Sequence, residues 1–313
     1  MRIVFCGTPE FAIPSLRRLL AEPGVTIEAV VTQPDRPRGR VQLVSGSAVK
    51  KAALKAGLHV YQPEKIKSDS AYDFFKRVRP DAVVIIAYGQ IIPARLIEVP
   101  PLGWINLHAS LLPKYRGAAP VHHAIANGEI QTGLTTMQID AGMDTGGILL
   151  QQTIEIRPDE TAPELLLRMA EAGAPLVAET LKKLGSGELT ARAQDHSQAT
   201  LAPILKKEDG RIDWRLNAAG IYNRMRGFHP WPGAFTTFRG KLAHLWGRPA
   251  RNVTQAVAVT PGTILATGGE IHVACGGGTC IRLSEVHVEG RRRLAARDFA
   301  NGARLEPGER FGA

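Results

Sequence analysis

The chain contains little cysteine and no long apolar segment. Three of its 313 residues are cysteines, Cys6, Cys275 and Cys280, and an odd number this small does not make a disulfide framework. We expect unpaired thiols, as in a reducing cytoplasm. No apolar run approaches the roughly 18 residues that a membrane-spanning helix needs. The apolar stretch at the N-terminus is also shorter than that of a signal peptide. A cytoplasmic location is therefore expected.

Two cofactor patterns are missing as well. The first apolar run ends at Gly7-Thr8-Pro9-Glu10, where a proline and an acid occupy positions at which a pyrophosphate would need bare backbone amides. This excludes the G-x-G-x-x-G fingerprint of nicotinamide and flavin dinucleotide sites. His122 and His123 are adjacent, and adjacent side chains on a helix diverge by about 100°. No cysteine or acid pattern completes a zinc site with them, so we expect a polar helix surface and no metal.

The remaining composition is that of an ordinary globular protein, with 44% hydrophobic and 22% charged residues. Its net charge of +10 is uneven, because residues 204–313 hold 17 Lys and Arg against 9 Asp and Glu. A basic C-terminal third indicates a polyanionic partner. Charge alone leaves nucleic acid binding and plain solubility equally open.

Short apolar runs alternate with helical patterns through the first half of the chain. The run Asp81 to Ala87 is continuous and rich in β-branched residues, which is typical of a strand buried on both faces. The alternation predicts an α/β fold with a doubly wound, mostly parallel, Rossmann-like sheet. Ligands of such sheets bind beyond the carboxyl ends of the strands. The predicted strands are 2–6, 27–32, 59–61, 81–87, 104–108, 133–139 and 147–156, and the predicted helices are 9–20, 47–56, 70–79 and 160–184.

From residue 210 the pattern changes to short strands with glycine-rich turns. We expect a small C-terminal β-barrel of the OB type. The predicted organisation is a catalytic domain over 1–184, a polar linker over 185–203 and a basic β-barrel over 204–313. A helix is expected near 218–226, and strands are expected at 235–238, 242–246, 262–265, 271–274 and 280–286.

The most informative segment runs from Asn106 to Gly117 and reads NLHASLLPKYRG. Residues two apart on a strand point to the same face, so Asn106 and His108 should look into one cleft at the end of the strand 104–108. Downstream, Asp144 lies on a glycine-bracketed loop. An amide donor, an imidazole base and a carboxylate are the groups that acyl transfer to an amine requires. Taken alone, Asp144 fits a turn residue equally well.

Together these segments resemble the formyltransferases that use 10-formyltetrahydrofolate, over nearly the whole length. The central block 106–120 and the loop 140–146 carry the resemblance to the family as a class. Two N-terminal segments, Gly7 to Pro9 and Gln33 to Pro37, point to its tRNA-formylating branch. Further matching segments are Phe5 to Ala12, Thr32 to Pro37, Ala87 to Gly89, Arg211 to Trp214 and Pro230 to Ala234.

The resemblance implies roles for individual residues. Asn106, His108 and Asp144 match the catalytic trio of the family. The implied folate contacts are Ser110, Leu111, Leu112, Pro113, Ala87, Tyr88, Gly89, Ile139 and Asp140. The implied reaction is transfer of a formyl group from 10-formyltetrahydrofolate to the α-amine of methionyl-initiator tRNA, for translation initiation, by a monomeric enzyme that needs no metal.

The tRNA substrate implies basic contacts, because phosphates supply much of the affinity for nucleic acid. The basic loop Arg36, Arg38 and Arg40 resembles the loop that family members place against the acceptor stem. It departs from the usual pattern at Val41 to Val44 and at Ser45 to Ala48, where it has fewer positive charges. In the β-barrel we expect contacts from Lys206, Lys207 and Arg224, with Arg226 and Arg291 to Arg293 as further candidates.

Two other functions fit part of the pattern. A formyltransferase for a sugar-nucleotide amine would share the catalytic trio, but it lacks the N-terminal segments named above. A folate-regulated RNA-binding protein without catalysis would not need the intact trio. The acceptor that gains the formyl group distinguishes all three.

Overall fold

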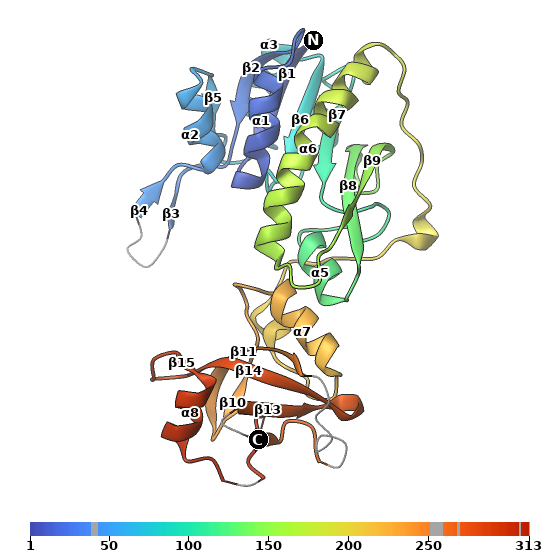
Figure 1. Ribbon diagram of the computed structural model, residues 1–313. Coiled ribbons are helices and arrows are strands. Elements are labelled where there is room, and N and C mark those ends of the chain that lie inside the picture. The colour runs from blue at the N-terminus through green and yellow to red at the C-terminus, as the bar shows by residue number, and fades with distance from the viewer. Residues whose placement is uncertain (39–42, 251–258, 268–269, 307, 313) are drawn as a thin grey trace. The chain divides into compact units, whose positions relative to one another are not determined.

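The computed structural model describes residues 1–38, 43–250, 259–267, 270–306 and 308–312, which form two compact units (Figure 1). Unit 1 contains residues 1–120, 131–155 and 164–203, and unit 2 contains residues 121–130, 156–163 and 204–313. Two segments before residue 184 thus group with unit 2, whereas the linker 185–203 groups with unit 1. In the described ranges, no helix is both long and apolar enough to cross a membrane.

Unit 1 is built on a seven-stranded sheet in the order β5-β2-β1-β6-β7-β8-β9. The first five strands pair in parallel, and β8 and β9 are antiparallel to their neighbours. The predicted doubly wound, mostly parallel sheet is therefore confirmed. The strands are β1 (Arg2–Gly7), β2 (Thr26–Val31), β5 (Val60–Tyr61), β6 (Ala82–Ile86), β7 (Trp104–His108), β8 (Gln131–Gln138) and β9 (Ile148–Glu155).

Helices cover both faces of this sheet, and in Figure 1 α1 and α6 lie in front of it. Trp104 packs on the α3 face, where its ring lies 5.1 Å from that of Phe75. Leu107 points to the opposite face, and Gly173 of α6 packs directly against it. Ser47 and Ser68 begin α2 and α3 by accepting from backbone amides, as N-caps do. The helices are α1 (Ile13–Leu20), α2 (Ala48–Lys55), α3 (Asp69–Val78), α4 (Ala94–Ile97) and α6 (Ala162–Gly185), with a 3₁₀ turn at Glu10–Ala12.

The basic segment after β2 forms a hairpin, whereas the sequence predicted an irregular loop. Strands β3 (Arg36–Arg38) and β4 (Leu43–Ser45) pair in antiparallel fashion. Asp35 lies at its base, where it accepts from Lys50 Nζ at 2.5 Å and from Gln62 Nε2 at 2.8 Å. These hydrogen bonds lower the pKa of the Asp35 carboxyl and stabilise its ionised form.

Unit 2 contains an antiparallel sheet in the order β10-β11-β14-β13-β12, with β15 paired to β14. Helices α7 and α8 pack Ile221 and Phe299 into its core. This is the expected OB-like barrel architecture, although the sequence did not indicate β15 or α8. The elements are α5 (Pro120–Ala126), α7 (Ala218–Gly227), β10 (Phe235–Phe238), β11 (Lys241–Ala250), β12 (Ile264–Thr267), β13 (Glu270–Cys275), β14 (Thr279–Val288), β15 (Leu294–Ala295) and α8 (Ala296–Ala303).

Trp104→Ala tests the packing that fixes β7. Trp104 is fully buried, and its Nε1 donates to the Leu96 carbonyl at 2.7 Å. We expect the substitution to lower the free energy of unfolding by about 3–5 kcal/mol, as for other large-to-small aromatic changes in cores. Trp231→Ala is the matched control, because Trp231 is 55% exposed. Equal urea midpoints for the two variants would contradict this assignment.

Candidate active site

Strand β7 brings Asn106 and His108 to the carboxyl-terminal edge of the sheet. The strand lies between β6 and β8, with Asn106 paired to Ile85 on one side and to Met137 on the other. His108 is 6% exposed, and Asn106 is half-buried. Both side chains leave the strand on the same face, as the spacing predicts. Within the described ranges, no protein group hydrogen-bonds the Asn106 carboxamide. It is therefore available to a bound molecule.

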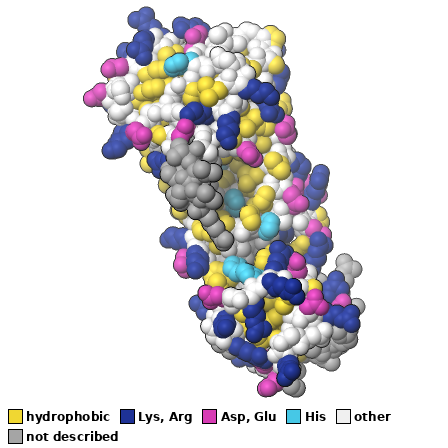
Figure 2. All heavy atoms as spheres, turned by 90° about the vertical axis from the view of Figure 1, so that its left-hand side faces the viewer, with side chains coloured by type: hydrophobic (Ala, Val, Ile, Leu, Met, Phe, Trp, Pro, Cys, Tyr) yellow, Lys and Arg dark blue, Asp and Glu magenta, His cyan; other side chains and the backbone are white. Residues whose placement is uncertain are grey.

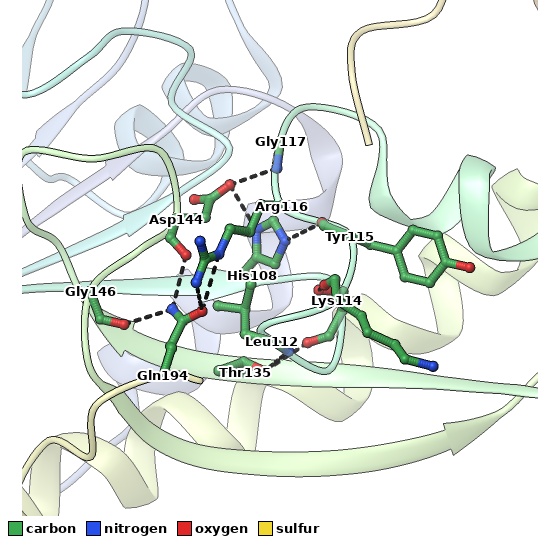
Figure 3. A network of polar contacts seen from close by, with 11 residues as sticks. His108, Leu112, Lys114, Tyr115, Arg116, Gly117, Thr135, Asp144, Gly146 and Gln194 are labelled. Atoms are coloured by element: carbon green, nitrogen blue, oxygen red, sulfur yellow. Dashed lines mark hydrogen bonds and ion pairs between the residues drawn. The ribbon is translucent and has the colours of Figure 1, made fainter. Parts of the chain in front are cut away.

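Asp144 reaches this pair from the loop between β8 and β9. Its Oδ2 lies 3.6 Å from His108 Nδ1 and accepts from the Gly117 amide at 2.8 Å (Figure 3). The loop is tight, because a Cβ at Gly146 would lie 1.8 Å from the Gln138 carbonyl oxygen. Asp144 itself has a φ of 52°, in the left-handed region. The turn therefore requires glycine at position 146 and aims the Asp144 carboxylate inward.

The hydrogen bonds of His108 assign its protons. Nε2 lies 2.9 Å from the Tyr115 carbonyl oxygen, which can only accept, so Nε2 carries a hydrogen. Nδ1 faces Asp144 at a distance too long for a direct hydrogen bond. In the neutral ring Nδ1 is thus a lone pair beside a carboxylate. A hydrogen placed on Nδ1 would point toward the Asp144 carboxylate.

The predicted folate segment 110–113 divides into two kinds of residue. Ser110 is fully buried, and its hydroxyl donates to the Lys114 carbonyl at 2.6 Å. Leu112 is buried against Met137 and Ile148. These two side chains fix the shape of the loop, whereas Leu111 and Pro113 are half-buried.

Thr135 ties the same segment to β8. Its hydroxyl donates to the Ser110 carbonyl at 2.7 Å and accepts from the Leu112 amide at 3.1 Å. Gln151 from β9 donates to both Thr135 Oγ1 and the Leu112 carbonyl, at 3.0 and 2.9 Å. The loop after His108 is therefore fixed by two strands that the sequence did not associate with it.

The second predicted folate segment, 87–89, follows β6. Ala87 is exposed, with a φ of 47°. The Tyr88 side chain is 2% exposed and lies in the core, and its burial raises the pKa of the phenol. Its carbonyl accepts from Thr8 and Gln33. Tyr88 can therefore meet a ligand through its backbone and not through its ring. Of the remaining predicted folate contacts, Gly89 and Asp140 are exposed, and Ile139 is half-buried.

The predicted basic contacts differ in their availability. Arg36 is exposed in unit 1, Arg38 is described for its backbone alone, and Arg40 lies outside the described residues with Val41 and Gln42. In unit 2, Lys206 and Lys207 are exposed.

Several predicted arginines are engaged within unit 2. Arg224 lies over the Phe228 ring and donates to the Asp209 carbonyl at 2.9 Å. Arg226 is 7% exposed and donates to the carbonyls of Arg157 and Glu160. The prediction of Arg226 as a phosphate contact is wrong, because the residue is buried and its guanidinium is used on backbone carbonyls within this unit. Arg293 is paired with Glu285, whereas Arg291 and Arg292 are exposed.

No cluster of metal-ligating side chains occurs in the part of the chain that the structure describes. His122 is partly buried, and its pKa is lowered by burial and by the neighbouring His123. The sequence predicted that this pair lies on a polar helix surface, but His122 is only partly exposed.

The fold and the site define a formyl transferase. The family model described as formyl transferase matches residues 1–181, and the model of the formyl transferase C-terminal domain matches residues 204–304. A solved sugar 3N-formyl transferase, WlaRD, has the same fold, with a TM-score of 0.67 at 16% identity over 93% of this chain and 99% of its own. HypX from Aquifex aeolicus in complex with tetrahydrofolic acid has a TM-score of 0.61 at 16% identity, over 99% of this chain and 48% of its own.

Within this class the chain belongs to the methionyl-tRNA formyltransferase family. A relative of that name from Solibacter usitatus is 53% identical over 312 residues, which cover 100% of this chain and 99% of the relative. One from Geobacter metallireducens is 48% identical over 314 residues, which cover 100% of this chain and 99% of the relative. The chain is accordingly a formyl-transferring enzyme.

Asp144→Asn tests the charge beside His108. The amide oxygen can still accept from Gly117, so the loop is preserved, but the negative charge facing Nδ1 is lost. We expect kcat for formyl transfer to fall by about 10²–10⁴-fold, the usual contribution of a positioned acid–base group. Asp73→Asn is the control, because Asp73 is exposed on α3. Turnover of Asp144→Asn equal to that of the control would remove Asp144 from the chemistry.

Proposed function

We propose that this protein transfers the formyl group of 10-formyltetrahydrofolate to the α-amine of methionyl-initiator tRNA. The observation that carries the proposal is the Asn106 carboxamide, which hydrogen-bonds no other described residue and lies on the strand that carries His108, the partner of Asp144. A hydrogen-bond donor and a proton acceptor at one strand end are what the attack of an amine on a formyl carbon needs. The family membership agrees with this chemistry.

Asn106 supplies the donor for the developing negative charge. As the amine nitrogen bonds to the formyl carbon, the carbonyl oxygen gains charge, and the Asn106 NH₂ can donate to it. Both nitrogens of His108 are directed elsewhere, Nε2 toward the Tyr115 carbonyl and Nδ1 toward Asp144. The geometry therefore favours Asn106 over His108 for this role.

His108 and Asp144 handle the proton. The attacking amine must lose a proton, and the folate N10 must gain one when its bond to the formyl carbon breaks. Nδ1 of His108 can accept the first proton because Nε2 already carries its own hydrogen. Asp144 would stabilise the imidazolium and help return the proton to N10. The protons balance without any further reactant.

The surroundings of the trio suit a folate. Leu111 and Pro113 are half-buried apolar residues in the segment that follows His108, and Met143 is 68% exposed on the Asp144 loop. Backbone groups are available just after β6, at Ala87 and Gly89, and just after β8, at Ile139 and Asp140. We assign the folate contacts to these side chains and backbone groups, whereas Ser110 and Leu112 act by shaping the loop.

The tRNA contacts are assigned to exposed basic residues, the class of side chain drawn in dark blue in Figure 2. Lys206 and Lys207 stand together on unit 2, and Arg36 stands on the hairpin of unit 1. The proposed set is completed by Arg38, Arg40 and Arg224. The Arg224 guanidinium is held by its hydrogen bond to the Asp209 carbonyl. The surplus of Lys and Arg in residues 204–313 supports a polyanionic substrate. The protein is proposed to act as a monomer.

One assay distinguishes the acceptors. The protein is incubated with 10-formyltetrahydrofolate and either charged initiator tRNA or an aminosugar nucleotide, and the formylated amine is identified. Formyl-methionyl-tRNA is the expected product. A formylated sugar nucleotide would replace this proposal with the sugar alternative, and binding of tRNA and folate without any product would support a non-catalytic role.

Asn106→Ala should lower kcat by about 10²–10³-fold, the usual loss for one oxyanion donor. The fold should survive, because Asn106 makes no hydrogen bond to another described residue. Asn301→Ala, on the exposed face of α8, is the matched control. Near-normal turnover of Asn106→Ala in a steady-state assay would exclude the carboxamide from the mechanism.

Lys206→Ala and Lys207→Ala should weaken tRNA binding and reduce its salt dependence. Each lost phosphate contact lowers the slope of log K against log salt by roughly 0.7–0.9. The measurement is the tRNA Kd over a series of KCl concentrations. Lys182→Ala, exposed at the end of α6, should leave the slope unchanged. Slopes that match this control for both variants would remove the two lysines from the tRNA surface.

A further inference from the structure

The polar connector after α6 is part of the structure around the active site. Residues 192–202, here called the strap, pair with both catalytic loops. Arg192 exchanges two backbone hydrogen bonds of 2.8 Å with Ile148, at the end of the Asp144 loop. Thr200 accepts from the Arg116 amide at 2.8 Å, and Ala202 donates to the Arg116 carbonyl at 2.7 Å. The strap therefore links two loops that lie far apart in the sequence.

One residue of the strap, Gln194, binds the Asp144 loop directly. Its side chain is buried, at 5% exposure. Nε2 donates to the Asp144 carbonyl at 2.9 Å and to the Gly146 carbonyl at 2.7 Å. Both hydrogens of the amide are thus used on the tight turn that aims the Asp144 carboxylate (Figure 3).

The oxygen of the same amide binds Arg116. Gln194 Oε1 accepts from Arg116 Nη2 at 2.6 Å and from Nε at 3.2 Å. The guanidinium is 7% exposed, and it also donates to His196 Nδ1 at 3.0 Å. All four hydrogen-bonding positions of the Gln194 amide are therefore occupied, and a buried network of this kind has a single arrangement.

Arg116 stands between the two backbone groups that fix the catalytic pair. The residue before it, Tyr115, accepts from His108 Nε2 through its carbonyl. The residue after it, Gly117, donates its amide to Asp144 Oδ2. Gly117 has a φ of 120°, and a Cβ there would lie 2.6 Å from the Ala202 carbonyl oxygen. Any movement of Arg116 thus moves the partners of His108 and Asp144 together.

We propose that Gln194 and Arg116 are positioning residues that set the separation of His108 and Asp144 in the formyl transfer reaction. The inference rests on the proposed function for its kinetic part. Neither side chain needs to touch the substrate. A displacement of reacting groups by about 1 Å can cost 10²-fold in rate. The hydrogen bonds of Gln194 and Arg116 oppose such a displacement of either His108 or Asp144.

Glutamine is the one side chain of this length that can donate to the two loop carbonyls and also accept from Arg116. Glutamate at position 194 would form an ion pair with Arg116, but it would present lone pairs to the carbonyls of Asp144 and Gly146. Methionine has a similar volume and would lose both sets of bonds. Both Gln194→Glu and Gln194→Met therefore remove the hydrogen bonds to the Asp144 loop, and only Gln194→Glu retains a contact with Arg116.

The kinetic test measures kcat and the tRNA Kd of both variants. We expect kcat to fall at least about 10-fold in each, with the tRNA Kd within twofold of the wild-type value. Asp195→Ala is the control, because the Asp195 carboxylate is exposed and caps Ser197 within the strap. It should retain wild-type kcat. If Asp195→Ala loses as much activity as the Gln194 variants, the strap acts through general stability and the inference fails.

A second readout needs no substrate. The imidazole nitrogens of His108 are followed by ¹⁵N NMR, with the signal assigned from its absence in His108→Gln. We expect the wild-type protein to show the Nε2-protonated form, and the Gln194 variants to alter the signal, whereas Asp195→Ala does not. Arg116→Lys replaces Gln194→Met if the latter does not fold, since lysine lacks the forked geometry.

The two measurements distinguish a failure of the proposed function from a failure of the positioning role. Absence of formyl transfer by the wild-type protein would overturn the proposed function and leave the NMR comparison intact. Wild-type kcat in both Gln194 variants, or a His108 signal that they leave unchanged, would overturn the positioning role.

Discussion

The proposed active site depends on a three-residue backbone segment, Tyr115 to Gly117, that binds both members of the His108–Asp144 pair. The carbonyl at one end receives the Nε2 hydrogen of the imidazole, and the amide at the other end donates to the carboxylate. The two contacts fix the tautomer of His108 and the direction of Asp144 at once. Nδ1 is left facing the Asp144 carboxylate, and the His108 side chain is 6% exposed.

The rest of unit 1 supports this segment. The sheet places β7 between two buried neighbours, so Asn106 and His108 are carried by a rigid element. Thr135 and Gln151 fix the loop after β7 from the other strands. Sites on regular elements are more exact than sites on free loops, and here even the loops are tied down by buried polar groups whose hydrogen bonds are made. Formyl transfer needs such order, because the amine, the formyl carbon and the proton acceptor must meet in one geometry.

Much of this was predictable from side-chain patterns, and the remainder was not. Alternation of buried runs and helices gave the sheet, and the two-residue spacing gave the shared face of Asn106 and His108. The roles of Tyr115 and Gly117 run through the backbone, which side-chain chemistry does not reveal. Gln194 lies in a polar stretch that is typical of a linker, and its partners are 48 to 78 residues away in the sequence. The burial of Arg226 was not predictable for the same reason, since the carbonyls that it binds come from a distant segment.

The central claim is that Asn106, His108 and Asp144 surround one formyl carbon. A structure of the protein with a stable formylated tetrahydrofolate tests it most directly. The account predicts the formyl oxygen at about 3 Å from Asn106 Nδ2, a hydrogen-bond distance, with the formyl carbon beside Nδ1 of His108. A folate bound with its formyl group away from Asn106, or on the opposite face of the sheet, would contradict it.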